Sequence, residues 1–297
     1  MENKIPVSVI IMTKNEEKNI RKCITSVSEF AEVFVVDSGS TDRTTEIASN
    51  MGANVVDFRW NGQYPKKKQW CLDYLPFQHE YVLYVDADEE VTSQLAQEIR
   101  TTFRKGTLSN GYFVGFDLVF MNKVLKYGHR MYKLVLLNRH KGKFLDYNDL
   151  NASNMWEVEG HYQPQIEGDT AVLKGSMVHY DHDSLFDYFA KHNRYSDWEA
   201  VVRSNGAMSN LNESQIFIRT FQKRIFNRIP MKWLVSFLHS YIIKLGFLDG
   251  SAGFHYAFAR CMYYWQIGIK MKEIEFHQNQ QQRMKLESEL RKAQEGI

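Results

Sequence analysis

Cysteine is scarce in this chain of 297 residues, with only Cys23, Cys71 and Cys261, far apart in the sequence. No CxxC spacing is present, which argues against a zinc site, and the odd count argues against a disulfide framework. We therefore expect a protein of a reducing, cytoplasmic compartment.

Long apolar runs and an excess of one charge are also missing. No stretch reaches the roughly 18 uninterrupted apolar residues of a membrane span, and the apolar run near the N-terminus is too short for a secretory signal. Lys and Arg number 37 against 35 Asp and Glu, and this net charge of +2 does not indicate nucleic-acid binding. With 44% hydrophobic residues, the chain can bury the core of one large domain, alone or with an appendage.

What is present is a regular alternation of strand and helix patterns over the first 90 residues. Apolar runs at 7–12, 33–37, 53–58 and 80–85 predict strands, and the segments between them predict helices. This alternation indicates a parallel, doubly wound α/β sheet. Ligands bind beyond the carboxyl ends of the strands in such sheets. We expect one edge of the sheet to hold a site near four strand ends, at Thr13, Asp37, Asp57 and Asp86.

Beyond about residue 107 the pattern changes. "GYFVGFDLVFM" and "YKLVLLN" predict longer, antiparallel strands, and 184–206 predict a helix. Residues 140–182 read as irregular apart from a short apolar strand, "GSMV", before His179. Residues 214–245 hold six basic residues and no acidic one, on amphipathic helices interrupted near Pro230. We expect two halves of an α/β domain followed by a helical, membrane-associating region, with bounds 1–106, 107–205 and 206–297.

Acidic residues follow the fourth predicted strand directly, in "VLYVDADEEV" at 82–91. Asp86 and Asp88 flank Ala87, and alternate residues at a strand end point the same way. Two carboxylates so placed form half of a site for a hard cation such as Mg²⁺ or Mn²⁺. Such a cation with a bound diphosphate would offset the repulsion between the acids. The alternative is a solvated acidic loop.

Four stretches together resemble the family 2 glycosyltransferases, which have the GT-A fold. They are "SVIIMTKNEEKNIRKCITSV", "VFVVDSGSTDRTTEIA", "PKKKQWCLDYL" and "YVLYVDADEEV", in the family's order and spacing over about the first 100 residues. The resemblance implies inverting transfer of a sugar from a nucleotide diphosphate donor. It implies a UDP-sugar as the donor substrate and Mn²⁺ or Mg²⁺ as the cofactor.

The resemblance also implies where the donor binds. By position, the family's contacts to uridine, ribose and base fall on Thr13, Asn15, Glu16 and Asp37.

The family's metal and diphosphate motif falls on Asp86, Ala87 and Asp88. In many GT-A enzymes a histidine further along completes the metal shell, and imidazole suits Mn²⁺. His179 is predicted to take this role, with His182 as the alternative.

Basic and aromatic residues complete the predicted donor site. Lys67 and Lys68 fall where a basic residue of the family approaches the donor, with solvated lysines as the alternative. Lys191, Arg194 and Tyr195 lie on the helix predicted at 184–206, and groups of this kind can stabilise a departing diphosphate. Surface ion pairs are the alternative for Lys191 and Arg194.

The later part of the chain resembles bacterial envelope sugar transferases that act on lipopolysaccharide core or related glycolipids. The subgroup has a His-Glu pair, near the general base, where this chain reads "WEVEGHYQP". Glu157 and Glu159 would face the same way in an extended segment, and Glu159 is preferred because it adjoins the "GHYQP" turn. Trp156 and His161 are the predicted acceptor contacts, with a core tryptophan and a loop histidine as the alternatives.

The sequence therefore predicts a metal-dependent hexosyltransferase, for a sugar such as glucose, on the inner face of the cytoplasmic membrane. Its acceptor would be a membrane-bound glycan or glycolipid of lipopolysaccharide-core or envelope polysaccharide synthesis. Residues 214–269 would meet the membrane, unless they pack on the catalytic domain or form a homo-oligomer interface. One competing class is a non-catalytic sugar-nucleotide binder at the membrane surface. A sugar nucleotidyltransferase is disfavoured because "TKNEE" lacks the glycines of that class.

Overall fold

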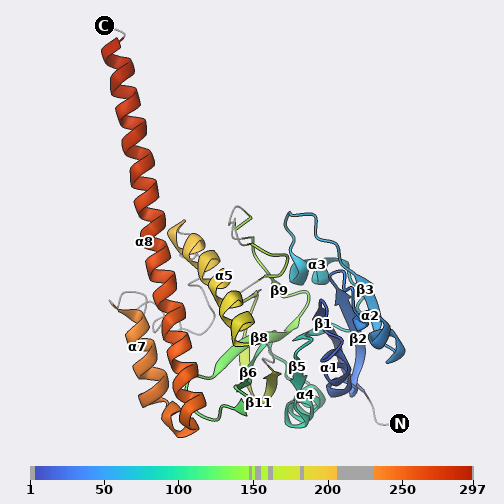
Figure 1. Ribbon diagram of the computed structural model, residues 1–297. Coiled ribbons are helices and arrows are strands. Elements are labelled where there is room, and N and C mark those ends of the chain that lie inside the picture. The colour runs from blue at the N-terminus through green and yellow to red at the C-terminus, as the bar shows by residue number, and fades with distance from the viewer. Residues whose placement is uncertain are drawn as a thin grey trace.

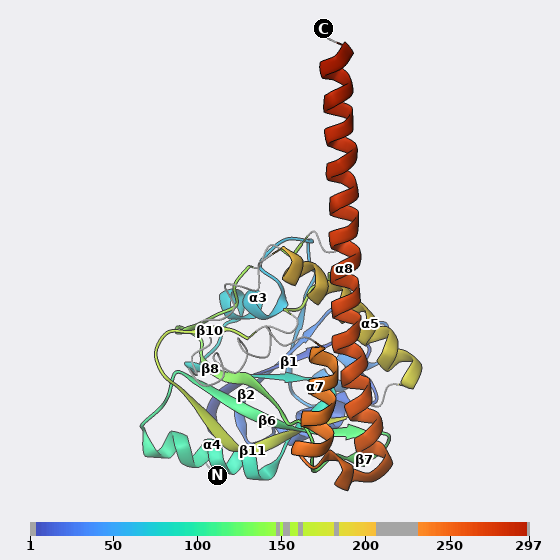
Figure 2. The same ribbon diagram turned by 90° about the vertical axis from the view of Figure 1, so that its left-hand side faces the viewer.

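The computed structural model describes residues 4–146, 149–150, 155–159, 163–180, 184–205 and 231–295, with side chains up to 291. A nine-stranded mixed sheet forms the centre, and helices flank it (Figure 1). The strands follow the order β3-β2-β1-β4-β8-β6-β11-β5, with β7 paired to β6. The long C-terminal helix extends well beyond this body in both views (Figures 1 and 2).

The N-terminal half contains the expected alternation. Its strands are β1 (Ile5–Thr13), β2 (Phe30–Asp37), β3 (Asn54–Asp57), β4 (Tyr81–Asp86) and β5 (Glu89–Val91). Its helices are α1 (Ile20–Ser26), α2 (Thr44–Asn50), α3 (Lys67–Tyr74) and α4 (Ser93–Lys105). Both faces of β1 and β4 are covered, and these strands are buried at every residue but Pro6 and Asp86, whereas the edge strand β3 has no fully buried residue.

Parallel pairing brings the four strand ends to one edge, as predicted. Thr13 lies opposite Asp37, and Asp37 lies opposite Asp57. On the other side of β1, Met12 lies opposite Asp86. The carboxyl ends of β1 to β4 are therefore neighbours, and every ligand-binding residue on these ends shares one surface.

The second half adds antiparallel and parallel strands to the same sheet. They are β6 (Gly111–Phe120), β7 (Lys123–Val124), β8 (Met131–Asn138) and β11 (Thr170–Tyr180), while β9 (Gly142–Lys143) and β10 (Gln165–Ile166) form a separate pair. The expected antiparallel pairing of β6 with β8 is confirmed. Because β5 of the first half pairs with β11 of the second, both halves share one sheet, and the bounds given above stay a prediction.

The short strand expected at "GSMV" is part of β11, but the expectation that the rest of 140–182 is irregular is wrong for this strand, which is eleven residues long and runs parallel to β6. The strand is hard to recognise because it carries Lys174, Gly175 and Ser176 in its middle. Gly175 is required there by packing, since a Cβ atom would lie 2.6 Å from the Leu95 Cα of α4. Because the helix lies so close, this part of the strand needs a glycine where an apolar side chain would otherwise mark a strand.

Helices complete the chain. They are α5 (Leu185–Ser204), α7 (Lys232–Leu238), the π-helical η2 (His239–Ile243), the 3₁₀-helical η3 (Gly246–Asp249) and α8 (Gly250–Glu295). The first part of α8 packs on α7 and on α5, where the Tyr263 hydroxyl donates to Glu199 over 2.5 Å. The α/β class with a C-terminal helical extension is confirmed. No helix in the described part of the chain combines the length and apolarity needed to cross a bilayer.

Candidate functional site

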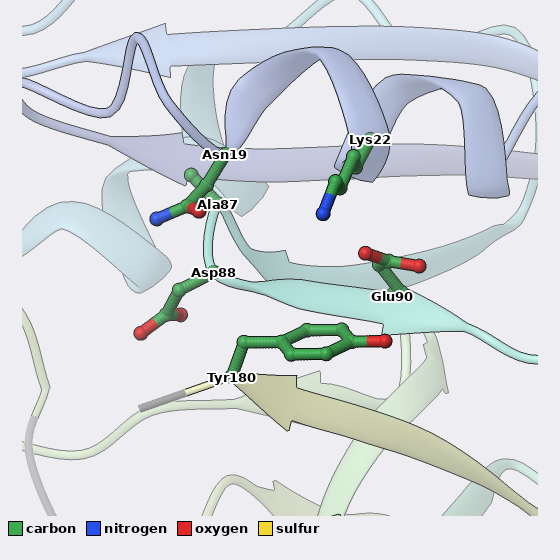
Figure 3. A pocket seen from close by; sticks show the side chains of 6 residues that line it. All are labelled: Asn19, Lys22, Ala87, Asp88, Glu90 and Tyr180. Carbon is green, nitrogen blue, oxygen red and sulfur yellow. The ribbon is translucent and has the colours of Figure 1, made fainter. Parts of the chain in front are cut away.

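The acidic turn between β4 and β5 lies at the ligand-binding edge. Main-chain bonds hold it in place, from Ala87 N to Met12 O at 3.2 Å and from Tyr180 N to Asp88 O at 3.0 Å. Figure 3 shows that the Asp88 side chain lies beside a small pocket between α1, the turn and the end of β11. The pocket is lined by Asn19, Lys22, Ala87, Asp88, Glu90 and Tyr180.

Behind the turn, Glu89 joins the charged groups into one network. Its Oε2 accepts from Asp86 N at 3.0 Å, and its Oε1 accepts from Lys133 Nζ at 2.8 Å. His179 reaches it from β11, with Nδ1 3.4 Å from Glu89 Oε1 and Nε2 3.7 Å from Asp88 Oδ2. Lys133 Nζ also lies 3.5 Å from Asp86 Oδ2. The sequence analysis missed Glu89 and Lys133, although Lys133 is conspicuous as the charge inside "YKLVLLN".

Burial and the charges in this network shift the pKa values of Asp88, Glu89 and His179. Burial raises the pKa of Asp88 to about 7, against the opposing charge of His179 and with repulsion from Asp86 and Glu89 adding to the rise. Burial alone would raise the pKa of Glu89, but Lys133 and His179 hold that pKa well below its usual range. Burial opposes ionisation of His179, yet Asp88 and Glu89 raise its pKa. The acids of the turn therefore already attract two basic side chains, Lys133 from β8 and His179 from β11.

The donor atoms fit a hard cation only in part. Neighbouring ligands of an octahedral ion lie about 3 Å apart for bonds near 2.1 Å, so Asp88 Oδ2 and His179 Nε2, at 3.7 Å, suit adjacent positions. Within the described residues, no three His, Cys, Asp or Glu side chains come close enough together to hold an ion. Asp86 lies beside Lys133. Oxygens of a bound diphosphate would have to supply the remaining ligands, and His182 lies outside the described residues.

At the end of β1, Thr13 is 4% exposed, and its buried Oγ1 has no hydrogen-bond partner among the described residues. Beside it, the Asp37 carboxylate accepts from Gly39 N at 2.9 Å, from Ser40 N at 2.8 Å and from the Ser40 hydroxyl. The Asp37 carboxylate is therefore already occupied by hydrogen bonds from its own loop, which it holds in shape, and it has little capacity left to accept a bond from a nucleobase. The Thr13 hydroxyl is the group here with unused bonding capacity.

Asn15 and Glu16 connect the loop after β1 to the loop after β2. Asn15, at φ 57°, accepts from Thr41 N through Oδ1 at 2.8 Å. Glu16 N donates to Thr44 Oγ1 over 2.7 Å, and the Glu16 carboxylate accepts from Asn19 Nδ2 over 2.8 Å. Their main structural effect is thus to hold the two loops together beside Thr13.

Lys67 and Lys68 occupy different environments. Lys67 is 2% exposed, and its Nζ donates to Ser38 Oγ over 2.7 Å and to Thr13 O over 3.3 Å. Burial lowers the pKa of Lys67, while the charge of Glu157 opposes this change. Lys68 is half-buried, with Nζ 5.9 Å from the centre of the Phe144 ring. Lys67 is therefore not a solvated lysine, and its ammonium lies beneath the strand ends where the donor is expected.

The two candidate bases also differ. Glu159 is fully buried, and its oxygens accept from Lys68 N at 2.6 Å and Gln69 N at 2.8 Å, the free donors at the start of α3. Burial raises the pKa of Glu159, and the bond from Gln69 N opposes the rise. Glu157 is half-buried and contributes its carbonyl to Lys67 N at 2.8 Å. The identity of the base stays a prediction, and these contacts favour Glu157 over Glu159.

A buried ion pair places α3 relative to α5. Lys66 Nζ and Trp198 Nε1 both donate to Asp149 Oδ2, over 2.6 and 2.8 Å, and all three side chains are at most 3% exposed. The sequence analysis missed this network, because "PKKKQW" does not reveal which of its lysines points inward. The network joins the helix that carries Lys67 to the helix that carries the remaining predicted donor contacts.

Those contacts on α5 lie near the acids. Burial raises the pKa of Tyr195, and Lys191 opposes the rise while Asp86 adds to it, so these groups share one electrostatic environment. Arg194 also opposes the rise and is exposed. Trp156 packs its ring 4.9 Å from the ring of Tyr195, so it is partly a packing residue. His161 lies outside the described residues.

Comparisons with known proteins show what this chain is similar to. The family model for glycosyl transferase family 2 matches residues 8–154. An uncharacterised glycosyltransferase of Rickettsia prowazekii is 29% identical over 230 residues, which are 75% of this chain and 77% of its own length. The resemblance found in the sequence is therefore confirmed: over residues 8–154 the chain is similar to glycosyl transferase family 2.

More distant relatives include a protein with a named role. The lipopolysaccharide core biosynthesis glycosyltransferase LpsC of Rhizobium meliloti is 27% identical over 209 residues, 66% of this chain and 71% of its own length. Among solved structures, the glucosyl-3-phosphoglycerate synthase of Mycobacterium tuberculosis, crystallised with Mn²⁺ and UDP, overlays with a TM-score of 0.38 at 19% identity. That overlay covers 64% of this chain and 77% of the synthase.

Proposed function

We propose that this protein is a metal-dependent, inverting glycosyltransferase that moves a hexose such as glucose from a UDP-sugar. Its acceptor is a glycan or glycolipid of lipopolysaccharide-core or envelope polysaccharide synthesis, at the inner face of the cytoplasmic membrane. The observation that carries the proposal is the Asp88–His179 pair, 3.7 Å apart, at the strand edge of a family 2 domain. The relationship to LpsC supports the class of acceptor.

The donor would lie along the ends of β1, β2 and β4. The Thr13 hydroxyl, which no group in the described part of the chain hydrogen-bonds, is available to the nucleotide, and Asn15, Glu16 and Asp37 hold the loops that frame it. Buried Lys67 places a positive charge below the same edge. A polar ligand that bonds to the Thr13 hydroxyl would remove the cost of a buried group without a partner.

Asp88 and His179 would hold Mn²⁺ or Mg²⁺ together with diphosphate oxygens, and the bound ion would draw charge from the leaving diphosphate. Lys191, Arg194 and Tyr195 of α5 would stabilise the same group as its charge develops. Against the rise that burial causes, the charges of Lys191 and Arg194 lower the pKa of Tyr195, while the charges of Asp86 and Asp88 raise it. The α5 residues therefore share the electrostatic environment of the acids that would hold the ion.

The acceptor hydroxyl would lose its proton to a carboxylate, as general base catalysis requires. Glu157 suits this role because it is half-buried and its charge reaches Lys67 near the donor edge. Trp156, next in the chain, would contact the acceptor sugar, as would His161.

The donor assay tests this function directly. We expect the protein with Mn²⁺ to hydrolyse one of a panel of UDP-sugars slowly without an acceptor, and excess EDTA to stop the reaction. We also expect UDP with Mn²⁺ to raise the melting temperature. Binding without hydrolysis or transfer would favour the non-catalytic sugar-nucleotide binder, and the absence of both binding and turnover would refute the proposal.

The helical extension would bring the enzyme to its acceptor. The segment that joins α7 to α8 exposes five large apolar side chains by 44 to 69%, namely Ile242, Ile243, Leu245, Phe247 and Leu248. It lies at the end of the helix pair remote from the C-terminus (Figures 1 and 2). Lys244 is exposed beside these residues, and the acid Asp249 is buried, with Oδ2 accepting from Tyr127 N.

An exposed apolar tip with a positive charge and a buried acid suits the surface of an anionic bilayer, where apolar burial and attraction to headgroups add. The expected membrane contact of 214–269 is therefore proposed for this tip. Residues 214–230 lie outside the described part of the chain. Much of α7 and the first part of α8 packs internally, for example Phe237 against Phe254 with ring centres 5.9 Å apart.

Vesicle co-sedimentation of the full chain tests the tip. We expect binding to vesicles with anionic lipid at low salt, and a loss of roughly tenfold or more in the Ile243→Asp/Leu248→Asp variant, since each side chain would bury apolar area. The matched control is Phe276→Asp/Leu290→Asp on distal α8, where 59% and 56% exposure make the change equally mild for the fold. Equal binding by the tip variant, or none by the native chain, would refute the contact.

A further inference from the structure

The structure contains a buried carboxylate that the catalytic scheme does not use. Glu89 is 1% exposed, so it cannot reach a substrate, and yet it contacts three of the groups around the acidic turn. We propose that Glu89, with Lys133 as its counter-charge, is a positioning residue that orients His179 for the cation and holds Asp86 in place behind Asp88. This inference rests on the proposed metal site and extends it to residues outside the donor motif.

The contact between Glu89 and His179 results from the register in which their two strands pair. In the antiparallel pairing of β5 with β11, Glu89 lies directly opposite His179. Side chains at opposite positions lie on the same face of the sheet, close enough to interact. The hydrogen bond at 3.4 Å thus follows from the backbone and does not depend on a flexible loop.

The bond also selects which nitrogen of His179 faces the site. If Nδ1–H donates to Glu89 Oε1, the lone pair lies on Nε2, which is the atom 3.7 Å from Asp88 Oδ2. A carboxylate that holds the far nitrogen of a metal-binding histidine fixes both the tautomer and the ring orientation. Glu89 would thereby present His179 to the same ion as Asp88.

Lys133 explains how such an acid is tolerated in the core. Its Nζ bonds to Glu89 Oε1 over 2.8 Å, lies 3.5 Å from Asp86 Oδ2 and rests 4.5 Å from the centre of the Phe116 ring. A buried carboxylate needs a paired charge and filled hydrogen bonds. Asp86 is held twice, by its backbone N–H to Glu89 and by its carboxylate near Lys133, which leaves Asp88 as the acid presented to the ion.

The test is the affinity of the full chain for Mn²⁺ in the presence of UDP, measured from the electron paramagnetic resonance signal of free Mn²⁺. We expect Glu89→Gln to weaken binding by about 10- to 100-fold, the usual effect of losing such a supporting group. The control is Glu90→Gln, which removes the same charge one residue along. Glu90 faces Lys22 and Tyr180 in the pocket of Figure 3, and we expect it to change affinity by less than about twofold.

The outcomes separate the two proposals. No Mn²⁺ binding by the native chain overturns the metal site and this inference together. Native binding with equal affinity in Glu89→Gln, or equal weakening in both variants, overturns only the positioning role.

A second measurement needs no folded variant of Glu89. Ring ¹⁵N shifts of the native chain with Mg²⁺ and UDP, assigned through His179→Gln, should show His179 protonated at Nδ1. A proton at Nε2 instead would overturn the inference.

Discussion

Asp88→Asn is expected to lower sugar transfer by at least about 10³-fold, because a bound metal ion contributes several kcal/mol of transition-state stabilisation and each 1.4 kcal/mol is tenfold in rate. Asp88 carries the oxygen nearest to His179 Nε2. Initial rates with a UDP-sugar and Mn²⁺ measure the loss, and Mn²⁺ binding should disappear with it. The free energy of unfolding should stay equal or rise, since Asp86 and Glu89 repel the native Asp88 charge.

The matched control for Asp88→Asn is Asp169→Asn. Asp169 is an exposed carboxylate that immediately precedes β11, while His179 lies at the other end of that strand. We expect its rate and Mn²⁺ affinity to equal those of the native chain. Near-native transfer by Asp88→Asn, or by the native chain in excess EDTA, would exclude a metal-dependent reaction.

Glu157→Gln is expected to lower transfer by about 10²- to 10⁴-fold, the range for loss of a general base. Binding of UDP and Mn²⁺ should be unchanged, because Glu157 reaches neither Asp88 nor His179 in any contact described above. Single-turnover rates together with titration of UDP separate these effects. The large loss is expected because amide and carboxylate have the same shape, and only the carboxylate accepts the proton.

Glu159→Gln provides the comparison, two residues along. It should lower the free energy of unfolding by about 1–3 kcal/mol, because one amide oxygen cannot accept from both Lys68 N and Gln69 N as the carboxylate does. Transfer by the folded variant should persist. A stable but inactive Glu159→Gln, beside an active Glu157→Gln, would return the role of base to Glu159.

The order of elements in the first half could be predicted because local pattern and final environment agree. Strands such as β1 are buried on both faces, so they are apolar along their length and visible without any partner. The site edge follows from the same reasoning, since parallel strands end together. The full length of β11 could not be predicted in this way, because its middle is shaped by the close contact of Gly175 with α4, which lies some 80 residues earlier in the chain.

The candidate site divides in the same way. Asp86, Asp88 and His179 were found from their order and from the resemblance, and the structure brings Asp88 and His179 together. Lys66 could not be told from Lys67 and Lys68, since each lysine has the same local signal. What separates them is a partner far along the chain: Asp149 for Lys66 and Ser38 for Lys67.

The sequence by itself determined the class of fold, the resemblance to a family and the edge where the acids gather, because these depend on residue type and on spacing within short segments. Only the tertiary structure decided which of the acidic side chains are buried and which groups they contact. Glu89 and Glu159 are carboxylates like Asp88 and Glu157, yet pairing of β5 with β11 buries the first against His179, and contact with α3 buries the second. Burial and long-range hydrogen bonds govern which carboxylates support the fold and which are left to face the proposed site, and neither can be read from the local order of residues.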